Sequence, residues 1–248
     1  SSDLWTKMIL TLEMKKLKRT GFLPAIFLGS LFACAFPLAN TALRPELFVQ
    51  QKLPATEILL NANGQMLSMV NLLLTVLGAC ILYHTEFSGS GIKKMNTLPV
   101  SQHLLFFHKT LLLLLGLAAA VLLESCCLGF CAVHWFPSEE MLPLHLAQHT
   151  GYAFFLLVPA ALLMMLIALS FENMWVTLGV GVICIFVSTM IPTDTAILGY
   201  FPFVLPFWRF FDIQDKETLL LSLCICLAEI LVLMFVEILL QKLRRKLS

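Results

Sequence analysis

Long apolar runs constrain the fold of this chain more than any other feature. Six of them lie near residues 21–39, 66–83, 104–133, 151–170, 174–191 and 218–240. The hydrocarbon core of a bilayer is about 30 Å thick, and an α-helix needs roughly 20 residues to cross it. Only 12% of the residues are charged, and the mean hydropathy is +0.91, whereas soluble domains are about 25% charged. The sequence therefore predicts an integral membrane protein.

The apolar runs are predicted to be helices. They lack the alternation of apolar and polar residues that is typical of strands in a membrane barrel. Inside lipid every backbone N–H and C=O group must find a partner within the protein, which a helix provides by itself. We therefore predict an all-α fold, in which residues 1–248 form one transmembrane domain of six spanning helices.

The basic residues predict the orientation of the chain. If both termini are cytoplasmic, twelve of the sixteen Lys and Arg residues lie on the inner side, as the positive-inside rule requires. These twelve are Lys7, Lys15, Lys16, Lys18, Arg19, Lys93, Lys94, Lys109, Lys242, Arg244, Arg245 and Lys246. The other four, Arg44, Lys52, Arg209 and Lys216, then lie outside. We predict cytoplasmic N- and C-termini.

The first residues form an amphipathic basic segment. Leu4, Met8 and Leu12 fall on one helical face, while Lys7 and Lys15 lie elsewhere. This pattern predicts an interfacial helix over residues 3–19 that rests on lipid at the inner leaflet. The same lysines also suit a simple anchor to anionic lipid, and both interpretations can hold together.

Three carboxylic acids interrupt the predicted spans. Glu124 lies in the third, and Glu229 and Glu237 lie in the sixth, where Glu237 could reach the inner headgroups. A carboxyl group in the membrane is costly and marks either an interhelical hydrogen bond or a pathway for substrate or protons. For Glu124 and Glu229 we favour the hydrogen bond, because the sequence shows no cationic or histidine partner in mid-membrane. Glu124 and Glu229 remain candidates for a substrate path.

Residues 191–217 are rich in aromatic residues and proline. They are too broken for a spanning helix and too apolar for a free loop, so we expect a segment that dips into the outer leaflet. One interpretation is an aromatic belt at the headgroups. The other is an outer gate over a substrate path, with Tyr200, Phe203 and Trp208 as its candidate residues.

Histidines near residue 140 raise the question of a metal site. His145 and His149 are spaced i, i+4, and His134 precedes them, which could in principle bind zinc. Two histidines at helical spacing are weak evidence, and we favour an interfacial, solvated face. We expect no metal site in this chain.

Several motifs are missing. The sequence has no G-x-x-x-x-G-K-[ST] loop, so any use of ATP requires another subunit. It also lacks H-E-x-x-H and G-x-S-x-G, which argues against an intramembrane enzyme and predicts a non-catalytic chain. The basic clusters lie where membrane topology already places them, so we expect no nucleic-acid partner.

The polar stretch HTEFSGSGIKKMNTLPVSQH, residues 84–103, separates the second and third runs on the predicted cytoplasmic side. Ile92, Met95 and Leu98 are spaced i, i+3 and i+6, roughly on one face of a short helix. Pro99 ends that helix. Lys93 and Lys94 are then left for solvent or for a partner protein.

The order of these parts resembles an ABC-2 type permease subunit. The pattern of that family's cytoplasmic coupling region is matched by Glu86, Gly89, Gly91, Leu98, Pro99, Val100, Ser101 and Lys109. The length near 250 residues and the EMKKLKRT segment at the start look most like permeases of the bacterial lantibiotic-immunity and bacitracin-resistance group.

The resemblance implies a role for several regions. Residues 3–19 would be the connecting helix, 191–217 an outer re-entrant element, and 84–103 the coupling loop that binds an ABC ATPase. The implied ATPase-coupling residues are Glu86, Gly89, Gly91, Ile92, Lys93, Lys94, Met95, Leu98 and Pro99. ATP and Mg would be bound by that partner ATPase, with no cofactor on this chain.

The resemblance also implies an exporter in the bacterial plasma membrane. It would contain a second permease chain, identical or homologous, and would export an amphipathic antimicrobial peptide such as a lantibiotic or extract it from the membrane. Two rival hypotheses stay open. One is a proton-coupled secondary transporter that uses Glu124 or Glu229, and the other is a membrane scaffold that transports nothing.

Overall fold

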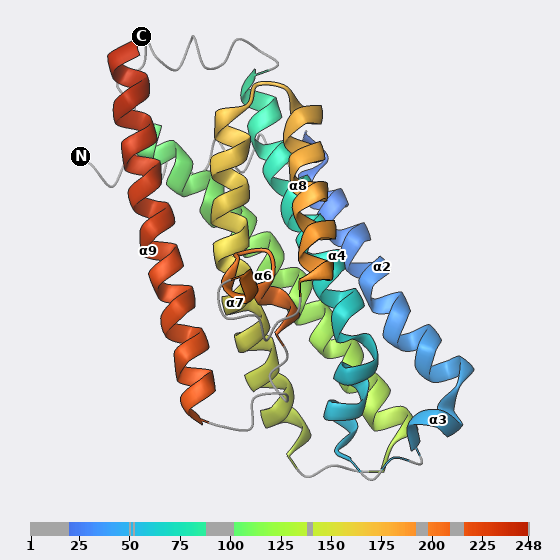
Figure 1. Ribbon diagram of the computed structural model, residues 1–248. Coiled ribbons are helices and arrows are strands. Elements are labelled where there is room, and N and C mark those ends of the chain that lie inside the picture. The colour runs from blue at the N-terminus through green and yellow to red at the C-terminus, as the bar shows by residue number, and fades with distance from the viewer. Residues whose placement is uncertain are drawn as a thin grey trace, which may run out of the picture.

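The computed structural model describes residues 20–49, 51, 53–87, 102–137, 141–191, 198–208 and 216–247. The longer helices are α2 (Phe22–Leu43), α4 (Ala55–Phe87), α6 (Gln102–Trp135), α7 (Leu142–Ser170), α8 (Met174–Met190) and α9 (Lys216–Leu247). The short ones are α3 (Pro45–Val49), η1 (Leu198–Tyr200) and η2 (Leu205–Phe207). They form an elongated bundle (Figure 1). No strand occurs within these described ranges, which confirms the all-α prediction for this part of the chain.

Five helices, α2, α4, α6, α7 and α9, are long and apolar enough to cross a membrane. Helix α8 is apolar but has 17 residues, or about 25 Å at 1.5 Å per residue. That length falls short of the roughly 30 Å hydrocarbon core. The structure is thus that of a multi-pass membrane protein, and the number of six spans stays a prediction.

Two of the helices begin well before the apolar runs that signalled them. The second run was expected from residue 66, yet α4 begins at Ala55, directly after Pro54. A polar residue of this additional stretch, Asn63, has hydrogen-bond partners. Its Nδ2 donates to the Leu59 carbonyl at 2.9 Å, and its Oδ1 accepts from Asn40 Nδ2 at 3.2 Å. Hydropathy marks the apolar part of a helix, whereas backbone hydrogen bonding continues past it.

Helix α4 lies at the centre of the bundle and contacts α2, α6, α7 and α8. Glycines allow the close approach that membrane helices need, since lipid provides no hydrophobic force between them. The Phe22 ring of α2 fits against Gly116 of α6, where an added Cβ would lie 3.1 Å from the ring. Gly181 of α8 packs on Val76 of α4, and a Cβ added to Gly181 would lie 2.6 Å from the Val76 side chain. Helix α9 packs mainly on α7 and is the least buried of the five long apolar helices.

Residues 198–208 fold back against the bundle, near the middle of its length in Figure 1. The turn η2 contacts α4 and α7, and the side chains of Phe203, Val204 and Leu205 are fully buried. Ser68 Oγ of α4 donates to the Pro206 carbonyl at 2.5 Å. These contacts attach the segment to α4 and α7. Its depth in the membrane, and the rest of the expected element at 191–217, stay predictions.

The connection between α4 and α6 bears on function. Helix α4 ends at Phe87 and α6 begins at Gln102, at the end of the bundle where α9 also ends (Figure 1). We call this the 88–101 end, and the opposite one the α3 end. Residues 88–101, and the expected interfacial helix at 3–19, lie outside the described residues.

Candidate functional site

A cavity of about 40 Å³ lies between α4, α6 and α7, with η2 on one side. Its polar lining consists of Asn61, Ser68, Asn71, Glu124, Ser125, His149 and Thr150. These residues come from the first half of α4, the second half of α6 and the first turns of α7. The cavity therefore lies closer to the α3 end than to the 88–101 end.

Glu124 is the acidic residue of this cavity. Its side chain is 4% exposed, and its Oε2 accepts a hydrogen bond from Asn71 Nδ2 at 2.8 Å. The bond joins α6 to α4, as expected of an acid inside a bundle. The other carboxylate oxygen, Oε1, and the amide oxygen of Asn71 are buried without a hydrogen-bond partner. The site thus has two acceptors left over.

His149 also lines the cavity, and its Nδ1 is buried without a partner. This corrects the expectation that His149 faces solvent and that no histidine accompanies the intramembrane acids. The physical reason is that α7 begins at Leu142, which places His149 about two turns inside a helix that packs on α4 and α6. Within the described ranges, no group of three or more His, Cys, Asp or Glu side chains is arranged to hold a metal ion.

Trp208 forms part of the cavity wall next to Pro206. Its Nε1 donates to the Gly199 carbonyl at 3.1 Å, and its ring centroid lies 5.3 Å from that of Tyr200. The fold therefore places two of the predicted path residues, Glu124 and Trp208, on one cavity, with Tyr200 behind Trp208. Phe203 is buried in the main apolar core, and Glu229 of α9 is absent from the cavity lining.

The two helices that flank residues 88–101 are joined by a buried lysine. Lys109 of α6 is 1% exposed, and its Nζ donates to the Leu82 carbonyl of α4 at 2.7 Å. The same Nζ lies 5.5 Å from the Tyr83 ring centroid. At this distance the ring attracts a cation above its face. Lys109 thus holds the last turns of α4 against the first turns of α6.

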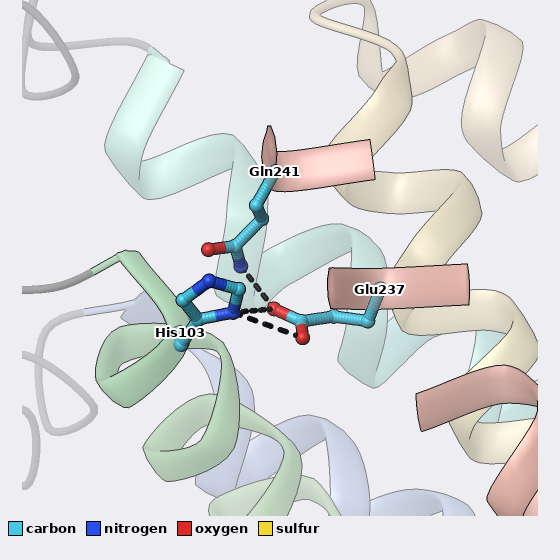
Figure 2. A network of polar contacts seen from close by, with 3 residues as sticks. All are labelled: His103, Glu237 and Gln241. Carbon is cyan, nitrogen blue, oxygen red and sulfur yellow. Dashed lines mark hydrogen bonds and ion pairs between the residues drawn. The ribbon is translucent and has the colours of Figure 1, made fainter. Parts of the chain in front are cut away.

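A second polar junction connects α6 to α9 at the same end (Figure 2). Nδ1 of His103 lies 3.0 and 3.1 Å from the two carboxylate oxygens of Glu237, and Gln241 Nε2 donates to Oε1 of the same carboxylate. Sequence reasoning missed this junction. The signal in the sequence was Glu237 inside an apolar run, a position from which we expect it to reach the lipid headgroups.

Of the predicted ATPase-coupling residues, the structure describes only Glu86. The backbone of Glu86 belongs to the last turn of α4. The others, Gly89, Gly91, Ile92, Lys93, Lys94, Met95, Leu98 and Pro99, fall outside the described residues. Their role stays a prediction.

Comparison with protein families matches residues 9–188 to the family described as ABC-2 family transporter protein. The match extends through most of α8, includes the 88–101 segment and ends before α9. Neither the curated proteins nor the solved structures include a match to this chain.

Proposed function

The chain belongs to the ABC-2 family of transporter proteins, and we propose that it is the transmembrane permease subunit of an ABC exporter. Permeases of this family are non-catalytic membrane subunits that work with ABC ATPase partners. The observation that carries the proposal is the family match over 9–188, supported by five helices long and apolar enough to cross a membrane.

In the proposed mechanism, a separate ATPase docks on residues 84–103 of the cytoplasmic side. In this mechanism the ATPase binds ATP and Mg, and this chain does not. The apolar face of Ile92, Met95 and Leu98 inserts into a groove of that partner, and closure of the ATPase on ATP changes the contact. Differential contact between two states of the partner is what transmits the change. Lys109 and His103 tie the flanking helices to the bundle, so a displacement of the segment reaches α4, α6 and α9.

Co-purification of the ATPase tests this mechanism. We expect Met95→Asp or Leu98→Asp to abolish capture of the ATPase at unchanged membrane expression, because a carboxylate cannot enter an apolar groove without a partner. Thr97→Asp is the matched control, since position 97 falls on the opposite face of the predicted short helix. Normal capture by both apolar-face variants would remove residues 84–103 as the docking element.

We further propose that two permease chains, identical or homologous, enclose the transport path in a bacterial plasma membrane, with both termini cytoplasmic. The substrate is an amphipathic antimicrobial peptide such as a lantibiotic, which is exported or extracted from the outer leaflet. The resemblance to lantibiotic-immunity permeases supports this substrate, and so does the Tyr200–Trp208 pair beside the cavity. Unchanged sensitivity to such peptides after deletion of the gene would refute it.

One observation favours a second candidate function, a proton-coupled secondary transporter. Glu124 and His149 line the same cavity, and carboxyl and imidazole groups are the usual proton carriers of membrane transporters. Uptake into liposomes driven by a pH gradient, with the purified chain and no ATPase, would support this alternative. Transport that requires an ATPase and ATP would exclude it.

A further inference from the structure

Unpartnered polar atoms gather around one cavity. Of six buried side-chain nitrogen and oxygen atoms without a hydrogen bond in the described part of the chain, three belong to residues of the cavity lining. They are Asn71 Oδ1, Glu124 Oε1 and His149 Nδ1. A buried polar atom without a partner costs about 1–3 kcal/mol, so three around one cavity point to a ligand that satisfies them.

The three atoms share one chemical property, which is that they can accept hydrogen bonds. Asn71 Nδ2 already donates to Glu124 Oε2, so the atom left on the amide is its oxygen. Glu124 Oε1 is an acceptor when the carboxyl is ionised, and His149 Nδ1 is one when the imidazole carries its proton on Nε2. The cavity lining contains no Lys or Arg. The cavity therefore fits a group that is cationic and rich in N–H donors.

The size and opening of the cavity limit which ligand groups can fit. A volume of about 40 Å³ exceeds the roughly 10–15 Å³ that one water-sized group needs, but it leaves no room for a bulky head. Asn61 is exposed and lines the cavity, so the cavity opens toward the α3 end. Gly64 lies beside it, and a Cβ there would meet no atom within 4 Å.

We propose that this cavity binds a primary ammonium group, R–NH₃⁺. Such a group has three donors for three acceptors and one positive charge for Glu124, and its alkyl stem leaves through the opening near Asn61 and Gly64. A quaternary ammonium has no N–H donor, and a hydroxyl has only one. An anion would meet acceptors in place of donors. The ligand chemistry stands whether or not an ATPase docks on residues 84–103.

Calorimetry on the full-length chain in phosphatidylcholine nanodiscs tests the proposal, with empty nanodiscs as the blank. The probes are n-hexylammonium and n-hexyltrimethylammonium, which share the tail and the charge and differ in N–H donors and in the size of the head. We expect the primary amine to bind at least about tenfold more tightly, the minimum for loss of charge-assisted hydrogen bonds. Equal affinities, or no protein-dependent binding of the primary amine, would overturn the proposal and leave water as the occupant.

Two variants with matched controls locate the binding. Glu124→Gln should weaken the binding of n-hexylammonium about tenfold or more. Glu229→Gln should not, because Glu229, an acid of α9 with one buried carboxylate oxygen, is absent from the cavity lining. Gly64→Phe fills the opening and leaves Glu124 intact, so it should also abolish binding. Gly151→Phe, at another glycine with open space around it, should bind normally. Equal effects of either pair would overturn the assignment.

The natural source of the amine follows from competition. A lysine-containing amphipathic peptide that displaces n-hexylammonium, while the same peptide with trimethylated lysines does not, identifies a peptide amine. Loss of n-hexylammonium binding in phosphatidylethanolamine nanodiscs identifies the lipid headgroup. Either result supports ammonium binding. Displacement of n-hexylammonium by both peptides to the same extent would contradict it, because trimethylated lysines have no N–H donor.

Discussion

The junction of His103, Glu237 and Gln241 offers the sharpest test of how α9 is held. We consider His103→Ala, which removes the imidazole that lies 3.0 Å from Glu237 Oε1 and leaves the carboxylate in place. Helix α9 otherwise packs mainly on α7. The substitution therefore separates the polar link between α6 and α9 from the apolar packing of α9.

The expected loss follows from the burial of the two partners. The Glu237 side chain is 4% exposed, so water cannot readily replace the lost contact, and a hydrogen bond to a charged group is worth about 1.5–3 kcal/mol. His103 is partly exposed, so solvent weakens the contact, and interhelical hydrogen bonds in membranes average about 0.6 kcal/mol. We expect His103→Ala to lower the free energy of unfolding by about 1 kcal/mol.

Unfolding by sodium dodecyl sulfate in mixed micelles, followed by circular dichroism, measures this free energy. Amide hydrogen exchange gives the local signal, because faster exchange around Glu237 with unchanged exchange in α7 indicates undocking of α9. His84→Ala is the control, since His84 is an exposed histidine at the end of α4. A loss no larger than that of His84→Ala, with unchanged exchange in α9, would refute the reasoning.

Three further predictions concern helix packing and capping. Gly181→Leu should lower stability by about 1–3 kcal/mol, because its Cβ would overlap α4; thermal unfolding should show no such loss for Gly179→Leu, whose Cβ meets open space. Asn173→Ala should cost about 1 kcal/mol by removing the cap that accepts the first-turn N–H of α8 at 2.9 Å, and Asn173→Asp should retain stability in the same assay. A double-mutant cycle of Asn71→Leu and Glu124→Leu should give a coupling energy of about 0.6–1.7 kcal/mol; a value of zero would remove their hydrogen bond as a stabilising contact.

Helix class and approximate position were predictable because they depend on local sequence. A run such as 104–133 is recognised against the bilayer thickness without knowledge of its neighbours, and α6 covers it. The first residues of α4 and α7 were harder to predict from the sequence. Asn63 lies within α4, where its side-chain amide bonds to Leu59 and Asn40, whereas a hydropathy pattern registers only that the residue is polar.

The candidate site was predictable only in part. Glu124 stood out because an acid in an apolar run is costly wherever it packs. Asn71, an amide within the second run, carried a weaker signal of the same kind, and its pairing with Glu124 depends on how α4 and α6 meet. His149 was assigned to a solvated face because the i, i+4 spacing of histidines says nothing about which side of a helix is covered.

The sequence by itself determined that this chain is an all-helical membrane protein, and its coupling-region pattern pointed to the ABC-2 family, to which residues 9–188 match. Both conclusions rest on properties of contiguous segments, namely apolar length, charge distribution and a short motif. Only the tertiary structure decided that Asn71, Glu124 and His149 line one cavity and that His103 contacts Glu237. Those pairings depend on the rotation and depth at which separate helices pack, and these are set by contacts such as Phe22 on Gly116.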